Sequence, residues 1–87
     1  MTHPANLPYT VVYTRAADRQ LRKLPAKDAE SVKAAVVRLA HSGEGDVKKL
    51  KGGGPFRLRV GSYRVFFDIQ ERTLAVLDIE RRTGNTY

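Results

Sequence analysis

Hydrophobic and polar residues alternate along the stretch 56–69, with one interruption at Gly61-Ser62. A period of two places alternate side chains on opposite sides of an extended strand. One side carries the apolar residues Phe56, Leu58, Val60, Tyr63, Val65, Phe67 and Ile69. The other side carries Arg57, Arg59, Arg64, Phe66 and Asp68. The pattern predicts a β-hairpin with one apolar face and one charged face.

The register of this hairpin follows from its turn. A glycine in the first position of a two-residue loop favours a tight turn, so Gly61-Ser62 is expected to join the strands directly. The predicted cross-strand pairs are then Val60 with Tyr63, Arg59 with Arg64 and Arg57 with Phe66. Two arginines thus face each other, and like charges directly across a ladder are destabilising. We therefore expect this face to bind an anion.

The N-terminal half of the chain predicts one strand and two helices. Residues 9–13 are β-branched or aromatic, which favours a short strand. A helix is predicted over 15–24 with Thr14 as its N-cap. A second helix is predicted over 26–42, where apolar residues recur at spacings of three and four. Gly43 is placed to end it as the residue after the last turn.

A further strand is predicted over 73–79. With a three-residue loop at 70–72, Arg64 faces Asp78 and the apolar residues of both strands share one side. A two-residue turn would place Asp78 among the core residues instead. Hydrophobic patterning therefore favours the three-residue loop.

These elements give the order β-α-α-β-β-β, which describes an α+β fold with a helical hairpin packed on a small, mainly antiparallel sheet. We expect a single domain over 1–87, with 1–8 as a loose arm. Val47 and Leu50 are expected to anchor a basic segment formed by Lys48, Lys49 and Lys51. The run 52–55, Gly-Gly-Gly-Pro, is expected to be a flexible connection.

Composition narrows the class of protein. The 87 residues are 41% hydrophobic, which is enough for one small core. The chain has no cysteine and two histidines, so disulfides, cysteine-zinc sites and histidine-rich metal sites are excluded. A formal net charge of +7 favours a polyanionic partner such as RNA, DNA or an acidic protein. No apolar run is long enough for a membrane span and no signal peptide is evident, so we expect a cytoplasmic location.

Two segments resemble the RelE/ParE toxin superfamily of bacterial type II toxin-antitoxin systems, namely Val-Lys-Lys-Leu-Lys-Gly at 47–52 and Phe-Arg-Leu-Arg-Val-Gly-Ser-Tyr-Arg-Val-Phe-Phe-Asp-Ile at 56–69. The order of elements, an arginine-rich end and a tyrosine near the end agree with this. The resemblance implies a RelE-like fold, a RelB-like antitoxin as partner in a hetero-oligomer, and no cofactor. The superfamily fold supports both ribosome-dependent mRNA endonucleases and gyrase inhibitors.

The resemblance to RelE-like endonucleases also implies site residues. Carried over to this sequence, the catalytic set is Arg57, Arg59, Arg64, Arg81 and Tyr87. The RNA-binding set is Lys48, Lys49, Lys51 and Arg82. Arg81 has the usual distance to the terminal tyrosine, whereas Arg82 would share the Arg64 face if the last strand continued, and this choice stays open. The chain has arginines where the best-known relatives have lysines, and no histidine near its end.

Metal-independent RNA cleavage uses the 2′-hydroxyl as nucleophile and needs a base, cations and an acid. Arginines suit phosphate binding but do not act as bases. Tyr87 is the predicted base, because nearby cations lower the pKa of a phenol, and stacking on a nucleobase is its alternative role. Arg64 has the alternative of a surface ion pair with Asp78. Tyr63, Phe66 and Phe67 are expected mainly in the core.

We therefore predict a toxin that enters the ribosome and cuts mRNA, inhibiting translation. Two alternatives remain at this point. The first is a ParE-like inhibitor of DNA gyrase. The second is a relative that binds RNA and antitoxin without cleaving.

Overall fold

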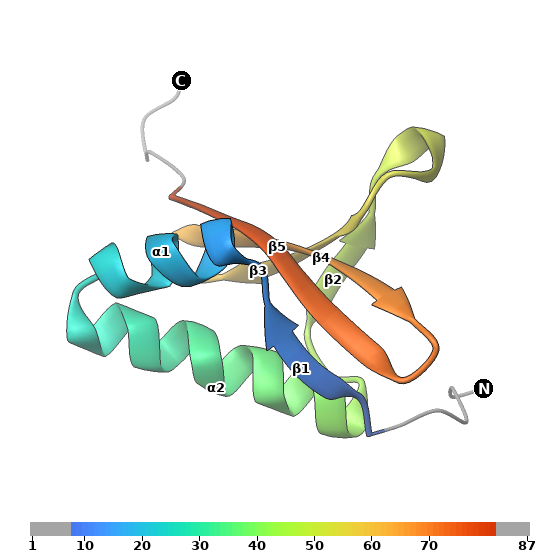
Figure 1. Cartoon of the computed structure of the whole chain (residues 1–87), viewed down its shortest axis with the longest axis horizontal. Helices are drawn as coiled ribbons and strands as arrows, with labels where there is room; N and C mark the ends of the chain where they lie inside the picture. The colour runs from blue at the N-terminus through green and yellow to red at the C-terminus, as the bar shows by residue number, and fades with distance from the viewer. Residues whose placement is uncertain (1–7, 82–87) are drawn as a thin grey trace.

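The computed structural model describes residues 8–81, which form five strands and two α-helices (Figure 1). In chain order the elements are β1 (Thr10–Tyr13), α1 (Arg15–Lys23), α2 (Ala26–Ser42), β2 (Asp46–Lys49), a short 3-10 turn η1 (Lys51–Gly53), β3 (Phe56–Val60), β4 (Tyr63–Gln70) and β5 (Thr73–Arg81). The predicted arm at 1–8 lies almost wholly outside the described residues. Within 8–81, no helix is long and apolar enough to span a membrane.

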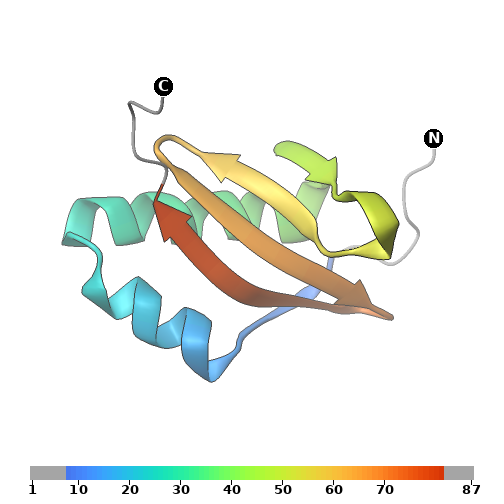
Figure 2. The same cartoon turned by 90° about the horizontal axis from the view of Figure 1, so that it is seen from above.

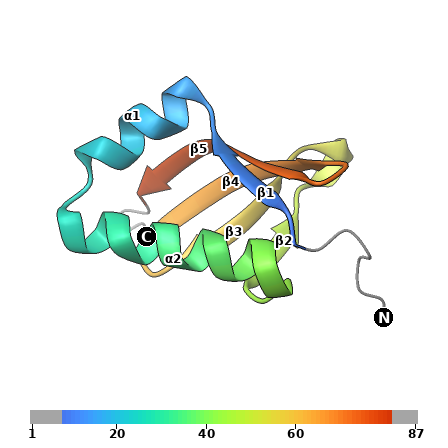
Figure 3. The same ribbon diagram turned by 60° about the horizontal axis from the view of Figure 1, so that its bottom comes forward.

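The five strands form one sheet in the order β1-β5-β4-β3-β2. The first strand runs parallel to β5, and the other neighbours are antiparallel. Figure 2 looks onto the face without helices, with α2 running behind the sheet and α1 beside β5. Figure 3 shows the same arrangement from the helix side. The α+β fold with a helical hairpin on a mainly antiparallel sheet is thus confirmed, and within residues 8–81 no helix covers the other face of the sheet, which we call the open face.

Local signals set both helices as predicted. The Thr14 hydroxyl accepts a hydrogen bond from the Ala17 N–H at 3.1 Å, which caps α1. Gly43 adopts φ 79° at the end of α2, a left-handed conformation that glycine accepts without steric cost. The helices bury Ala17, Leu21, Val32, Val36, Leu39 and Ala40. Figure 1 shows the two helices converging on the same side of the sheet.

The core lies between the helices and the inner sheet face. The strands contribute Leu58, Tyr63, Val65, Phe67, Leu74, Val76 and Ile79, each at most 6% exposed. Those of β3 and β4 are alternate positions of the predicted apolar face, whereas Leu74 and Val76 lie on the side of β5 that the predicted register gave to Asp78. Phe56 covers the edge of this core and stacks on Phe67 with ring centroids 5.3 Å apart.

The hairpin register between β3 and β4 is confirmed. The cross-strand pairs are Val60 with Tyr63, Arg59 with Arg64 and Arg57 with Phe66. Gly61 has φ 56°, as the first position of such a turn requires.

The predicted register between β4 and β5 is wrong. The turn has two residues, Glu71 and Arg72, since Gln70 pairs with Thr73. A bulge then changes the register, because Phe67 pairs with Val76 whereas Phe66 pairs with Asp78. A bulge inserts one residue and re-aims the side chains beyond it. Asp78 thereby leaves the core side, which patterning alone could achieve only with a longer loop.

The chain also forms a strand that its sequence did not predict. Residues Asp46–Lys49 pair antiparallel with β3 as β2, at the edge of the sheet. The segment has the sequence Asp-Val-Lys-Lys, and all four side chains are exposed. It therefore lacks the alternation of apolar and polar residues that predicts a half-buried strand. Pairing of the backbone with β3, rather than burial of side chains, therefore holds Lys48 and Lys49 at the edge of the sheet. Val47, expected as an anchor, is 37% exposed.

Candidate nucleic-acid interface

The open face of the sheet carries two cross-strand rows of charged residues. One row runs across the four antiparallel strands as Asp46, Arg59, Arg64 and Glu80. The adjacent row runs as Lys48, Arg57, Phe66 and Asp78. We call the four cations of these rows, Lys48, Arg57, Arg59 and Arg64, the arginine face.

The nearest acidic partner of Arg64 is Glu80 rather than Asp78. The Arg64 Nη2 atom lies 3.4 Å from Glu80 Oε1, and both side chains are more than a third exposed. The predicted Arg64–Asp78 pair is therefore wrong, because the two-residue turn and the bulge each shift β5 along β4 by one residue. Asp78 instead accepts a hydrogen bond from Gln20 of α1 at 2.6 Å.

The opposed arginines are bracketed by carboxylates. Asp46 pairs with Arg59 on one side of the row, and Glu80 pairs with Arg64 on the other. The sequence from 48 to 67 contains no carboxylate, but the sheet brings these two in from flanking strands. Their charges offset part of the repulsion between Arg59 and Arg64. The repulsion argument from sequence therefore holds only in part, and Arg57, beside Lys48, is the arginine without an acidic cross-strand neighbour.

In two of the arginines, Arg57 and Arg64, part of the guanidinium group is buried. The Nε atoms of Arg57 and Arg64 are buried and have no hydrogen-bond partner among residues 8–81. Both side chains nevertheless remain partly exposed. Burial of Nε restricts the movement of each guanidinium group, and the partly exposed remainder of the side chain is the part that an incoming acceptor can reach. A phosphate suits such a group, because its oxygens accept several guanidinium hydrogens at once.

Arg81 lies on the opposite side of the sheet from the arginine face. It pairs with Tyr63, whose side chain is buried on the helix side, and its guanidinium carbon lies 6.0 Å from the centre of the Tyr63 ring. The Tyr63 hydroxyl donates a hydrogen bond to Asp28 of α2 at 2.7 Å. This bond, burial and the Asp28 charge raise the pKa of Tyr63, while Arg81 opposes the shift. Arg81 thus belongs to a different cluster.

The predicted site residues fall into four groups. Those that the structure brings together are the arginine face, Lys48, Arg57, Arg59 and Arg64. Lys49 and Arg81 point to the other side, since Lys49 pairs with Phe56 and its Nζ lies 5.6 Å from the centre of that ring. Arg82 and Tyr87 lie outside the described residues. Lys51 lies in η1.

Glu80 is the residue of this face that sequence reasoning missed. It is the second-last residue of β5, and its place beside Arg64 depends on the bulge between β4 and β5. One signal in the sequence could have identified it. Residues two apart in a strand lie on the same side, and Glu80 is two residues from Asp78, which was correctly expected on the charged side. A carboxylate next to a cationic face can accept a proton.

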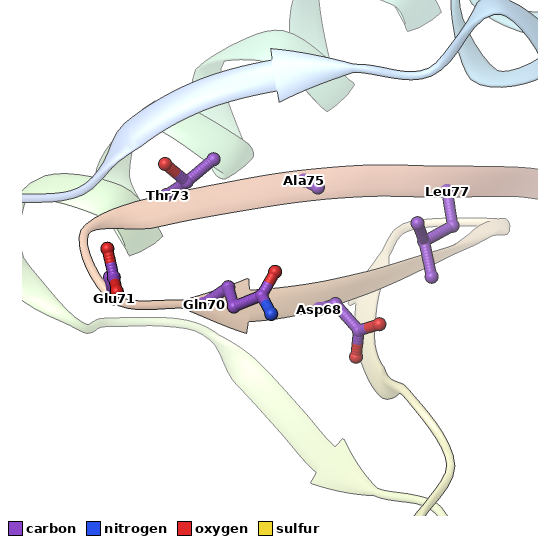
Figure 4. A pocket seen from close by; sticks show the side chains of 6 residues that line it. All are labelled: Asp68, Gln70, Glu71, Thr73, Ala75 and Leu77. Carbon is purple, nitrogen blue, oxygen red and sulfur yellow. The ribbon is translucent and has the colours of Figure 1, made fainter.

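A separate hollow lies at the far end of the open face, around the β4–β5 turn. Its lining residues are Asp68, Gln70, Glu71, Thr73, Ala75 and Leu77 (Figure 4). It contains two carboxylates and no cation, so it does not extend the arginine face. Among residues 8–81, no group of three or more histidine, cysteine or acidic side chains is placed to hold a metal ion.

Comparison with known proteins decides the family. Residues 11–85 match the family model described as the ParE toxin of the type II toxin-antitoxin system, parDE. The chain belongs to this toxin family. Membership confirms the resemblance to the RelE/ParE superfamily, and the chain is thus a toxin of a type II toxin-antitoxin system. No curated protein sequence matches it.

Solved structures of this superfamily share the fold. The RelBE2 toxin-antitoxin complex of Mycobacterium tuberculosis is 32% identical, with a TM-score of 0.63, over 87% of this chain and 100% of that one. The archaeal RelE-RelB complex of Pyrococcus horikoshii gives 23% identity and a TM-score of 0.76, over 91% and 100%. The chromosomal ParDE system of Pseudomonas aeruginosa gives 14% and 0.71, over 87% and 98%. The fold is therefore shared with proteins described as RelE and as ParE.

Proposed function

We propose that this toxin stops translation by cutting mRNA on the ribosome, with the arginine face holding the RNA backbone. The observation that carries the proposal is the pair of Arg57 and Arg64 on adjacent strands, each with a buried and unpartnered Nε atom within the described chain. Guanidinium groups fixed in this way are suited to the two charged oxygens of a phosphodiester. A basic patch that served only solubility would not need them.

The reaction that fits these residues is transfer within the RNA strand. The 2′-oxygen loses its proton and attacks the adjacent phosphorus, and the bond from phosphorus to the 5′-oxygen breaks. The products are a 2′,3′-cyclic phosphate and a 5′-hydroxyl that has taken up a proton. Negative charge builds up on the phosphate oxygens at the transition state. Arg57, Arg59 and Arg64 would stabilise this charge, and one such donor is typically worth about 100-fold to 1,000-fold in rate.

Two groups compete for the role of base. Tyr87 is the one expected from the family resemblance. Glu80 is the carboxylate of the described face that contacts an arginine, with Arg64 Nη2 at 3.4 Å. Replacing each in turn, as Glu80→Gln and Tyr87→Phe, assigns the role: the variant that lacks the base loses the rise of cleavage rate with pH.

A RelB-like antitoxin is the proposed partner. The relatives from Mycobacterium tuberculosis and Pyrococcus horikoshii are described as toxin-antitoxin complexes. The present chain has a net charge of +7, so an acidic or amphipathic segment laid across the arginine face would neutralise it and exclude RNA. A hetero-oligomer of toxin and antitoxin is the expected resting state.

Cleavage of mRNA on purified translating ribosomes, mapped by primer extension, tests the proposal. We expect Arg57→Ala to cut about 100-fold more slowly or worse. Arg38→Ala is the matched control, because it removes an equal charge from an exposed position of α2. Equal loss in both variants would mean that total charge matters and the face does not. Uncut mRNA with tight RNA binding would identify a non-catalytic relative instead.

The second candidate is inhibition of DNA gyrase, and the ParE description of the matching family model favours it. A supercoiling assay with purified gyrase, run beside the translation assay, separates the two. Inhibition of supercoiling without cleavage of mRNA would replace the first proposal by this one.

A further inference from the structure

Phe66 occupies an unusual position for a phenylalanine. It lies on the open face of the sheet, paired with Arg57 on one side and Asp78 on the other. Its neighbours at 65 and 67 are buried in the core, whereas Phe66 is only partly buried and does not belong to the core cluster. The expectation that Phe66 serves the core is therefore wrong, although it holds for Tyr63 and Phe67.

The open face offers this ring few apolar neighbours: Ala75 and Leu77 line the hollow around the β4–β5 turn, and Leu77 is the extra residue of the bulge next to the Phe66–Asp78 pair. In the described strands, Phe66 is the one aromatic residue whose position faces outward from the sheet. Its cross-strand neighbours are an arginine and an aspartate rather than apolar side chains. Asp78 is turned toward α1 by its hydrogen bond with Gln20. The ring thus lies outside the core, and a role in binding accounts for its position.

Cations surround this ring on the side of the arginine face. Arg57 is directly opposite, Arg64 is two residues earlier on the same strand, and Arg59 is the diagonal neighbour. Side chains directly opposite in a ladder have Cβ atoms about 4.5–5.5 Å apart, and diagonal neighbours are about 7–8 Å apart. An aromatic ring within one or two side chains of several phosphate-binding groups matches the layout of a nucleotide, which carries a flat apolar base beside an anionic phosphate.

We propose that Phe66 is the stacking platform for one unpaired nucleobase of the RNA whose phosphates the arginine face holds. This inference rests on the proposed function and adds a base-binding subsite to it. A phenyl ring has no hydrogen-bonding group, so the subsite accepts any base and favours purines through their larger stacking area. It also requires single-stranded RNA, because a base inside a duplex has no free face to offer.

A competing explanation is that the ring only supports the Arg57 side chain. A thermodynamic cycle separates the two roles, since stacking needs a base on the RNA and support of Arg57 does not. The probe is a single-stranded oligonucleotide of about ten nucleotides, within the usual site size, with 2′-O-methyl sugars that prevent cleavage. A matched set replaces one nucleotide at a time by an abasic site.

Phe66→Leu keeps an apolar side chain and removes the ring. We expect it to weaken binding of the intact oligonucleotide about 10-fold to 100-fold, the usual value of one base stacked on an aromatic side chain. On the oligonucleotide that lacks the stacked base, wild type and Phe66→Leu should bind equally. Phe66→Trp should keep wild-type affinity, and its indole, unique in a chain without tryptophan, should be quenched when RNA binds.

The outcomes separate this inference from the function on which it rests. If Arg57→Ala loses affinity and Phe66→Leu does not, the stacking platform is overturned and RNA binding stands. If Phe66→Leu loses the same factor on every abasic oligonucleotide, the ring only supports Arg57, and the platform is again overturned. If neither Arg57→Ala nor Phe66→Leu changes affinity, the arginine face does not bind RNA and the proposed function fails as well. Tight binding of antitoxin alone that depends on Phe66 would assign the ring to the protein partner.

Discussion

The two faces of the sheet are built from the same strands but obey different rules. On the helix side, seven residues of β3, β4 and β5 are apolar and at most 6% exposed, and they form one core with the helices. On the open side, the intervening residues include Phe66, the uncharged residues around the β4–β5 turn and six charged side chains of β3, β4 and β5, namely Arg57, Arg59, Arg64, Asp68, Asp78 and Glu80. Burial of apolar area stabilises the fold, whereas exposed ion pairs contribute little. Stability and binding should therefore separate cleanly by side-chain direction.

Adjacent phenylalanines provide the sharpest test of this contrast. Phe67 is 1% exposed and stacked on Phe56, whereas Phe66 lies on the open face. We expect Phe67→Ala to lower the free energy of unfolding by about 3–5 kcal/mol, because it leaves a cavity in the core. Phe66→Ala should cost about 1 kcal/mol or less. Urea denaturation of both variants measures the difference, and equal losses would refute the division between the faces.

The contact between α1 and the edge of β5 is the next test of what stabilises the helix side. Beyond β1, the side chain of Gln20 takes over the edge: its Oε1 accepts the Ile79 N–H at 2.8 Å, and its Nε2 donates to Asp78. We expect Gln20→Ala to cost about 1–3 kcal/mol, because a partly buried backbone donor loses its partner. Arg19→Ala, at an exposed position of the same helix, is the control and should change stability by about 0.5 kcal/mol or less. A similar effect of both would assign the loss to helix propensity instead.

The Tyr63–Asp28 contact adds a pH dependence to the helix side. The pKa of Tyr63 is raised above its ordinary value of 10.0 in the folded state, first by the hydrogen bond to Asp28. The unfolded chain therefore releases this proton at lower pH than the folded one, and the contribution to stability is full below pH 10.0 and is lost as pH rises through the folded pKa. Tyr63→Phe should make stability fall less steeply above pH 10.0. An unchanged slope would show that Tyr13, whose pKa is raised by burial, carries the alkaline sensitivity.

Changes on the open face should have the smallest effect on stability. Arg64 and Glu80 form an exposed pair at 3.4 Å, so Arg64→Ala and Glu80→Gln should each change the free energy of unfolding by about 0.5 kcal/mol or less. The Arg64→Ala protein should nevertheless lose cleavage. Thermal melts at low and high salt, measured with the cleavage assay, check both statements. A loss of several kcal/mol would place Arg64 in the framework of the fold.

Local chemistry explains which parts of the fold were predictable. The turn at Gly61-Ser62, the cap at Thr14 and the end of α2 at Gly43 depend on residues within a few positions of each other. Each was read correctly from the sequence. The two helices and the hairpin of β3 and β4 follow from these signals and from hydrophobic periodicity.

Long-range contacts explain the rest. The bulge in β5 coincides with the point where β1 ends, and Thr14 there bonds the Val76 and Leu77 carbonyls from outside the sheet. No residue pattern within β5 predicts this bulge. The missed acid beside Arg64 and the false pairing with Asp78 both follow from it. For the last strand, position along the chain favours Arg82 for the arginine face and the spacing of the family pattern favours Arg81, and of the two only Arg81 lies within the described residues.

Strand β2 has a further consequence for the free protein. It lies at one end of the sheet order, and within the described chain it pairs only with β3, so its other edge presents backbone groups that a second copy could extend. Lys48 and Lys49 lie in that strand, and two copies aligned edge to edge would bring these charges together. The lysines thus act against self-association, and the same residues that favour a polyanion keep the sheet from growing into an aggregate.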